Sequence, residues 1–523
     1  MNKFFDTYFM EFMELFPSTN DYLCLKEYSD YKRYFENSLS PDHIEIQKKF
    51  FNKYNKVRLP NNDISKIFKY NIEKSLDSFN YNFHLMPLNH SDSVISYFAE
   101  MASGKSLYKF KTKKDFLLFI EKSHHFTIYI NQAIINMKEG IKKKVVIPKR
   151  ICKLLIEQIK DTIKSKSYRY TDIPKLLDYN ITIQDILEPC LKNLLKFLVH
   201  EYYPNCCENI GLVFLPNGKK MYQHLVDSYT TLNNANIDKI HNYGLSEVNR
   251  IYQEMIKIKD QYKFKGSLKE FNKMINNKSE YKFKDSKELV NFYKNMQKYI
   301  QNTVFKEKFN IKISHQYLIK EVPKFNQKFA PAAYYMPGSL DKSRKGTFYI
   351  NTNNIKEMNK LEAESLVLHE GNPGHHLQLT YLLDNNFPLF LKTIDLTAYE
   401  EGWALYCEQL GEYKDPLSYY GKLNMEMERA IRLVVDTGIH YYGWSFKKCF
   451  DFFKKYSLTQ NESIKSELDR YIAIPGQALA YKMGEKIFKD LKRKNTKSEK
   501  DFHNKIITKG PLPLFILKKL KIN

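Results

Sequence analysis

The stretch that decides the interpretation of this chain is His369-Glu370-Gly371-Asn372-Pro373-Gly374-His375-His376-Leu377-Gln378. It follows a run with helical spacing of apolar residues, 358–368, which predicts a helix that ends on His369. A histidine followed at once by a glutamate offers an imidazole ligand and a carboxylate base, which metal-dependent hydrolysis requires. We therefore interpret the stretch as a metal site.

The spacing of the second histidine departs from the common zinc-helix pattern, in which it follows at i+4. Here that position is Pro373, followed by Gly374. Proline removes a backbone donor and glycine tolerates unusual backbone angles, so the helix should bulge or kink there. A bulge that absorbs two extra residues selects His375 as the second ligand, and one that absorbs three selects His376. We favour His375, and the alternative stays open.

The composition is that of a globular chain. Its 523 residues are 43% hydrophobic and 15% aromatic, and no apolar run approaches the length of a membrane span. The seven cysteines form no CxxC pair, which favours reduced thiols and argues against a cysteine-bound structural zinc. The acidic residues among the N-terminal aromatics are unlike a secretory signal, so we expect a cytoplasmic protein without a membrane partner.

The net charge of +24 raises the alternative of a non-catalytic protein that binds polyanions. Most of the basic residues are lysines spread over the whole chain, without an arginine-rich cluster or a basic-aromatic stripe. This distribution predicts solvated lysine faces and no specific nucleic-acid partner.

The expected fold is mainly α with a small β-sheet. Helices are predicted over 4–16, 64–76, 113–138, 148–164, 183–200, 246–258 and 287–300, with Ser246 as an N-cap. The β-strand patterns are confined to 310–351. Apolar and polar residues alternate over 311–319, and the segments 332–336 and 346–351 flank a turn. An edge strand of such a sheet could hydrogen-bond an extended peptide beside the metal.

The remaining site residues are expected after the metal helix. Glu401 is the natural third ligand, because a site with two histidines needs one more and an open position for water. His440, Tyr481 and Arg470 are candidates for stabilising an oxyanion, and a buried polar network is the other interpretation of these three.

The chain resembles the domain of unknown function 885 family, whose signature is HExxPGHHxQ followed by EGWALYxExL. These motifs correspond to 369–378 and 401–410, and the match extends to LPNG at 215–218, AYY at 333–335, RLVVDTGIH at 432–440 and PGQALAYKMG at 475–484. The resemblance covers 205–523 in order. It is loose before that, so we predict an N-terminal helical lobe, 1–204, and a catalytic region, 205–523.

The resemblance implies a gluzincin-like zinc peptidase fold with a deep helical cleft. We therefore expect a zinc peptidase acting on short or unfolded peptides, with one Zn²⁺ held by His369, His375 and Glu401 and with Glu370 as general base. Tyr334 and Tyr335 would lie along the substrate. A metal-dependent hydrolase of esters or non-peptide amides is the alternative.

Overall fold

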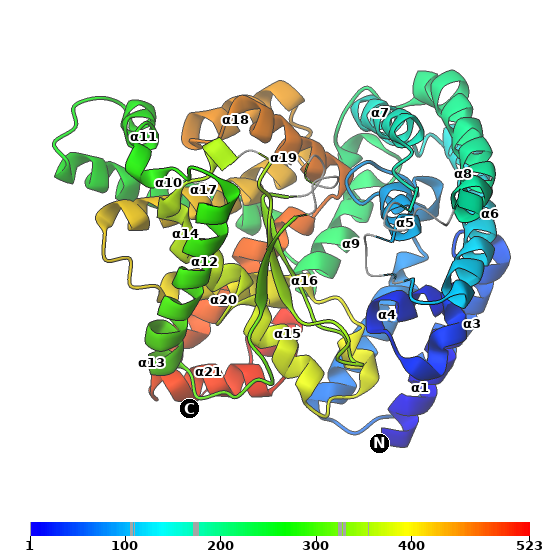
Figure 1. The fold of residues 1–523 in the computed structure, drawn as a ribbon, viewed down its shortest axis with the longest axis horizontal. Coiled ribbons are helices and arrows are strands. Elements are labelled where there is room, and N and C mark those ends of the chain that lie inside the picture. Colours follow the sequence, from blue (N-terminus) through cyan, green and yellow to red (C-terminus); the bar gives the residue numbers. More distant parts are fainter. Residues whose placement is uncertain are drawn as a thin grey trace.

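The computed structural model describes residues 2–522 except 105–107, 109, 171–176, 323–326, 328–330 and 354. The chain is mainly helical, as predicted, and the helices before residue 200 gather on one side (right in Figure 1). Their bounds are α1 Asn2–Leu15, α2 Asn20–Leu23, α3 Pro41–Asn55, α4 Asp63–Ser78, α5 Val94–Ala102, α6 Lys113–Lys143, α7 Lys149–Ser165 and α8 Leu177–Phe197.

The helices after residue 200 include most of the family-signature motifs quoted above. They are α9 Gly218–Thr230, α10 Ile237–Gln261, α11 Leu268–Asn276, α12 Ser286–Ile300, α13 Lys306–Lys308, α14 Ala363–Glu370, α15 His375–Asp384, α16 Thr397–Cys407, α17 Pro416–His440, α18 Phe446–Tyr456, α19 Asn461–Ala473, α20 Ala480–Lys494, α21 Glu499–Thr508 and α22 Leu514–Leu517. The predicted helices are confirmed, but the start at Ser246 is wrong. α10 begins at Ile237, where the Asn236 side chain accepts a hydrogen bond from the Lys239 N–H.

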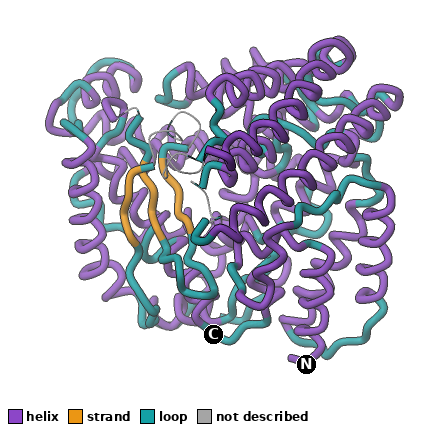
Figure 2. Tube along the Cα trace, turned by 45° about the vertical axis from the view of Figure 1, so that its right-hand side comes forward, coloured by secondary structure: helices purple, strands orange, loops and turns teal. Residues whose placement is uncertain are grey.

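Three short strands form the predicted sheet: β1 Leu318–Glu321, β2 Ala333–Met336 and β3 Thr347–Ile350. Their order is β1-β3-β2, with β1 parallel and β2 antiparallel to β3, and they lie side by side in Figure 2. The predicted hairpin is therefore confirmed. The alternation over 311–319 marks mainly the approach to β1, because only Leu318 and Ile319 of that range are paired.

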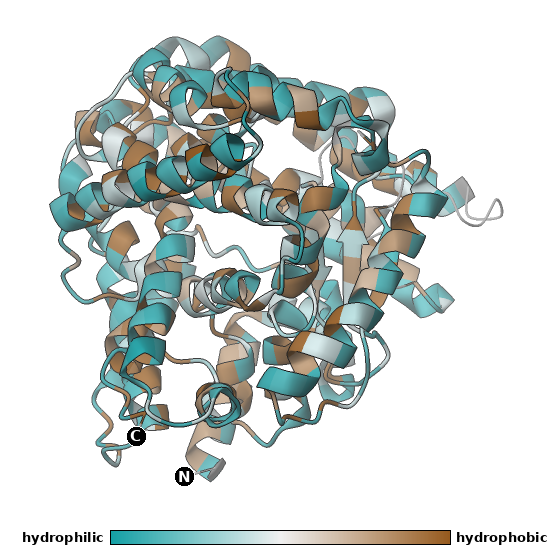
Figure 3. Cartoon of the chain, turned by 90° about the vertical axis from the view of Figure 1, so that its left-hand side faces the viewer, coloured by the Kyte–Doolittle hydropathy of each residue, from teal (hydrophilic) through white to brown (hydrophobic). Residues whose placement is uncertain are grey.

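Two large hydrophobic clusters of described residues stabilise the molecule, and each draws on both sides of residue 204. One packs Phe98 and Leu194 with Ile431, and the other packs Phe68 of α4 with Phe390 and Leu377. Teal and brown segments alternate along the outer helices of Figure 3, as expected for helices that bury one face. Among the described residues, no helix combines the length and apolar character that a membrane span needs.

α16 and α20 pack unusually closely, because a glycine of each lies at their contact. A Cβ on Gly402 would lie 2.3 Å from the Cα of Gly484, and a Cβ on Gly484 would lie 2.0 Å from the Ala398 carbonyl oxygen. Glu401 adjoins the first glycine and Tyr481 begins the helix that carries the second. The two glycines therefore set the distance between two elements of the candidate site.

Candidate metal centre

The helix that carries His369 and Glu370 is interrupted before His375, as the sequence predicts. α14 ends at Glu370, Asn372-Pro373 is a cis peptide, and α15 begins at His375. A Cβ on Gly374 would lie 1.9 Å from the His369 carbonyl oxygen, so only glycine allows the two turns to approach this closely. The Trp403 Nε1–H donates to the Pro373 carbonyl at 2.8 Å, which satisfies an acceptor inside the break.

His369, His375 and Glu401 converge on one point, each offering one ligand atom within 4.8 Å of the others. The two histidine Nε2 atoms lie 3.4 and 3.6 Å from Glu401 Oε2. Ligand atoms about 2.0 to 2.1 Å from a tetrahedral Zn²⁺ would lie ~3.3 Å apart, so the separations fit. Glu401 Oε2 is also buried without a hydrogen-bond partner among the described residues. The residues present therefore fit a bound divalent metal.

His376 points away from this group. It is fully buried, its Nε2–H donates to the His315 carbonyl at 3.0 Å, and its Nδ1 accepts from the Tyr335 hydroxyl at 2.8 Å. Burial lowers the pKa of His376 to about 3, so the ring stays neutral. The structure thus brings His375, and not His376, beside His369 and Glu401.

Glu408 is a site residue that sequence reasoning missed. Its Oε1 accepts from His369 Nδ1–H at 2.7 Å, and its Oε2 accepts from the Ser365 hydroxyl at 2.8 Å. A carboxylate on the second nitrogen of a metal-binding histidine fixes its tautomer and orientation. The available signal was the second glutamate of the EGWALYxExL motif, two helical turns after Glu401.

Glu408→Gln is expected to weaken zinc binding roughly 10- to 100-fold, because the amide no longer attracts the His369 proton as a carboxylate does. Competition with a chromophoric chelator measures the affinity. Glu462→Gln, whose side chain is 83% exposed, is the matched control and should bind zinc like the wild type. An unchanged affinity in Glu408→Gln would contradict a role for this contact in holding the ligand.

Glu370 follows His369 in the chain and is within electrostatic reach of His375 and Glu401. It is the last residue of α14, it is buried, and burial raises its pKa, while His369 and His375 oppose this effect. The charge of a bound metal would oppose it further. Two of the grouped side chains are partly exposed, Glu401 by 20% and His375 by 12%.

The three oxyanion candidates differ in their surroundings. Both ring nitrogens of His440 are bonded to backbone, Nδ1 accepting from Leu212 N–H at 3.2 Å and Nε2–H donating to the Tyr471 carbonyl at 3.0 Å. Both hydrogen bonds of His440 join segments of the backbone, so they support a structural role rather than an oxyanion role. Tyr481 is half-buried, and burial and then the Glu401 carboxylate raise its pKa. Arg470 donates hydrogen bonds to Gln477 Oε1 and to Glu467 Oε2.

Tyr334 and Tyr335 point to opposite faces of the sheet, as neighbours in a strand do. Tyr335 is committed to His376, whereas Tyr334 stacks on Tyr349 with ring centroids 5.2 Å apart and stays half-buried.

Residues 47–520 match the model of a family described as "Bacterial protein of unknown function (DUF885)". The chain belongs to this family. A search of curated proteins gave no match. The fold is similar to that of a "putative lipoprotein" from Colwellia psychrerythraea, with a TM-score of 0.87, 22% identity and coverage of 99% of this chain and 97% of that one. A second "putative lipoprotein of unknown function", from Shewanella oneidensis, has a TM-score of 0.78, 15% identity and 99% coverage of both chains.

This DUF885 chain has a second group of side chains whose ligand atoms lie within 4.8 Å of one another. It consists of three carboxylates, those of Glu247, Glu426 and Glu485. Lys482 Nζ already occupies its centre, at 3.1 Å from Glu247 and 2.5 Å from each of the other two. Lys422 and Arg250 also pair with Glu426. The group is a buried ion network, so one metal per chain is the expectation.

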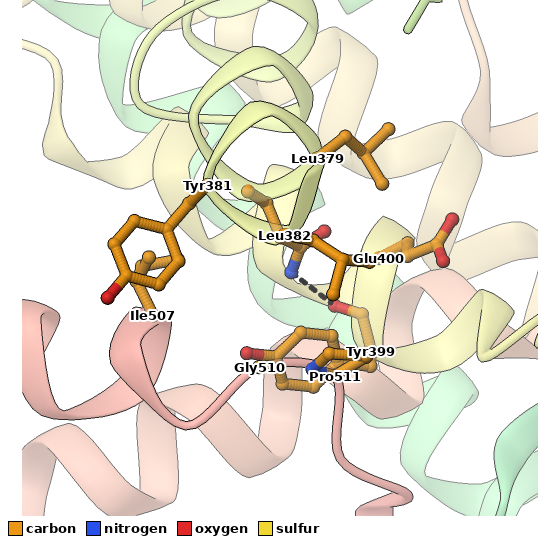
Figure 4. A pocket seen from close by; sticks show the side chains of 9 residues that line it. Leu379, Tyr381, Leu382, Tyr399, Glu400, Ile507, Gly510 and Pro511 are labelled. Carbon is orange, nitrogen blue, oxygen red and sulfur yellow. Dashed lines mark hydrogen bonds between the residues drawn. The ribbon is translucent and has the colours of Figure 1, made fainter. Parts of the chain in front are cut away.

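A small pocket of the DUF885 chain lies between α15, α16 and the segment after α21 (Figure 4). Its lining is mostly apolar: Leu379, Tyr381, Leu382, Tyr399, Ile507 and Pro511. Gln378 donates across it to the Tyr399 carbonyl at 3.4 Å. None of the three grouped ligands lines it, so it is separate from the candidate metal centre.

Proposed function

We propose that this chain is a zinc-dependent peptidase whose metal is held by His369, His375 and Glu401. The observation that carries the proposal is the convergence of these three side chains, with Glu408 on the outer nitrogen of His369. Glu370 follows His369 in the chain and is close enough for His369, His375 and Glu401 to affect its pKa. Two imidazoles and a carboxylate leave a fourth position open, which is typical of catalytic rather than structural zinc.

When bound, zinc supplies a Lewis acid that acidifies water and polarises the substrate carbonyl. Glu370 takes the proton of the attacking water and passes it to the leaving amine. The buried position of Glu370 suits this exchange, because burial raises the pKa of its carboxyl and so makes the carboxylate a stronger base. Tyr481 donates its phenolic hydrogen to the oxygen on which negative charge develops.

The substrate backbone is proposed to lie along β2. This strand pairs only with β3 among the described strands, so its other edge keeps backbone donors and acceptors for an extended peptide. The bond from Tyr335 to His376 fixes β2 beside α15, which begins with the ligand His375. Tyr334, on the other face, would contact substrate side chains.

Metal removal tests the proposal. Purified protein should carry about one zinc by elemental analysis, and a chelator should abolish hydrolysis of an unstructured peptide library, with zinc restoring it. Matched ester substrates provide the comparison: ester hydrolysis without peptide hydrolysis would identify a different metal hydrolase. Stoichiometric absence of metal, together with unchanged activity of His369→Ala, would overturn the proposal. The alternative of a non-catalytic protein that binds polyanions through its lysines would then explain the net charge better.

A further inference from the structure

Two arginines beside Tyr481 share a single carboxylate oxygen. Arg432 Nη2 and Arg470 Nη2 lie 3.2 and 3.0 Å from Glu467 Oε2, and the Tyr471 hydroxyl donates to the same oxygen at 2.6 Å. Two guanidinium groups thus face one carboxylate. Because arginine stays charged in proteins, this cation pair brings two positive charges into direct contact with one carboxylate.

The other carboxylates near the cation pair are engaged elsewhere. Asp436 accepts hydrogen bonds from the Tyr222 hydroxyl at 2.6 Å and from the Gly476 N–H at 3.1 Å. Burial also raises the pKa of Asp436 to about 7, which reduces its negative charge near neutral pH. Glu428 accepts from the Thr459 hydroxyl. Glu428 acts on Arg432 and Asp436 acts on Arg470 only electrostatically, and among the described residues neither carboxylate hydrogen-bonds to these guanidinium groups.

The cation pair adjoins the proposed oxyanion donor. The Arg432 guanidinium carbon lies 4.5 Å from the centre of the Tyr481 ring. Gln477 bridges from the other side, because its Oε1 accepts from Arg470 Nη1 at 2.7 Å and its Nε2 lies 3.5 Å from the Tyr481 hydroxyl. The side-chain amide of Gln477 thus lies between Arg470 and the Tyr481 hydroxyl.

Both arginines have capacity left for an anion. Arg432 is 8% exposed, and its buried Nη1 has no hydrogen-bond partner among the described residues. An unpaired buried donor is costly, which favours a ligand that supplies an acceptor. Arg470 keeps 23% of its side chain accessible, so an anion can approach it from solvent. Planar guanidinium groups bind carboxylates with paired hydrogen bonds.

We propose that this cation pair binds the free C-terminal carboxylate of the peptide, so that the enzyme is a carboxypeptidase. The inference rests on the proposed peptidase function. Successive Cα atoms are about 3.8 Å apart, so a carboxylate at Arg470 places a bond one or two residues from the C-terminus beside Tyr481. Water adds hydroxyl to the carbonyl carbon and a proton to the leaving nitrogen. The C–N bond breaks, and the products are a shortened peptide and a free amino acid or dipeptide.

The test compares one N-acetylated hexapeptide as its free acid and as its C-terminal amide, using the full zinc-loaded chain. We expect kcat/KM for the acid to exceed that for the amide by roughly 30-fold or more, as for loss of a desolvated charge pair. Mass spectrometry should find the C-terminal amino acid or dipeptide released first. Equal rates, or cleavage first at an internal bond, would overturn the carboxypeptidase inference and leave the peptidase proposal intact. Absence of zinc-dependent cleavage of both peptides would overturn both.

Arg470→Gln provides the second arm. We expect the ratio of kcat/KM for the free acid to that for the amide to fall toward one, with zinc content retained. Arg493→Gln is the matched control, because that side chain is 73% exposed, and it should behave as the wild type. An Arg470→Gln variant that lowers both rates equally would contradict carboxylate recognition. The acid-to-amide ratio of the wild type decides the question even if this variant does not fold.

Discussion

Glu370→Gln is expected to lower kcat for peptide hydrolysis roughly 10²- to 10⁴-fold, the usual contribution of a general base. Glutamine keeps the shape of the side chain but cannot take a proton from water. Glu370 is absent from the group of three ligands, so zinc content should stay near that of the wild type. Steady-state kinetics and elemental analysis on the same preparation measure the two effects.

The control for this variant is Glu462→Gln, which changes an exposed carboxylate far from the ligands in sequence. If Glu370→Gln retained more than about a tenth of wild-type activity, with zinc bound, Glu370 would not be the base, since a tenfold loss is far below that contribution. Loss of zinc in the variant would instead make Glu370 part of the ligand set.

Gly402→Ala is expected to destabilise the chain by about 3 kcal/mol, toward the upper end of overpacking effects. The new methyl would lie 2.3 Å from the Gly484 Cα and 2.5 Å from its carbonyl carbon. Both are backbone atoms, so no side-chain rotation relieves the clash and α16 must move away from α20. The free energy of unfolding, from urea denaturation, measures the cost.

Gly338→Ala is the matched control for this glycine, because its Cβ would meet no atom closer than 3.1 Å. Its effect should be clearly smaller. Since Glu401 precedes Gly402, the Gly402→Ala variant should also bind zinc more weakly. A stable variant with unchanged zinc affinity would show that the close helix contact does not control the ligand geometry.

The local part of the site could be predicted from the sequence. A histidine and a glutamate at a helix end, followed by Pro373-Gly374, already required a break that returns a second histidine. The sequence favoured His375 but left His376 open, because the choice depends on the His315 carbonyl and Tyr335, which other segments bring to His376. Chain neighbours alone do not specify such partners.

The same limit explains why one site residue was missed and why the contacts of another were not foreseen. The contact of Glu408 with His369 arises because α16 packs against α14, which the spacing within one motif does not reveal. His440 was selected for its chemistry, yet its partners are backbone groups of residues 212 and 471. Among the secondary elements, the early start of α10 depended on the Asn236 cap, a weaker signal in an asparagine-rich chain.

The hydrogen bond from Trp403 to the Pro373 carbonyl gives the protein a built-in optical probe. The indole is fully buried and contacts the backbone that joins the two histidine ligands, so a change in that backbone alters its electronic environment. The chain has only one other tryptophan, Trp444, which packs with the other hydrophobic cluster. Intrinsic fluorescence of a Trp444→Phe chain therefore reports on the segment between the ligands, without an added dye.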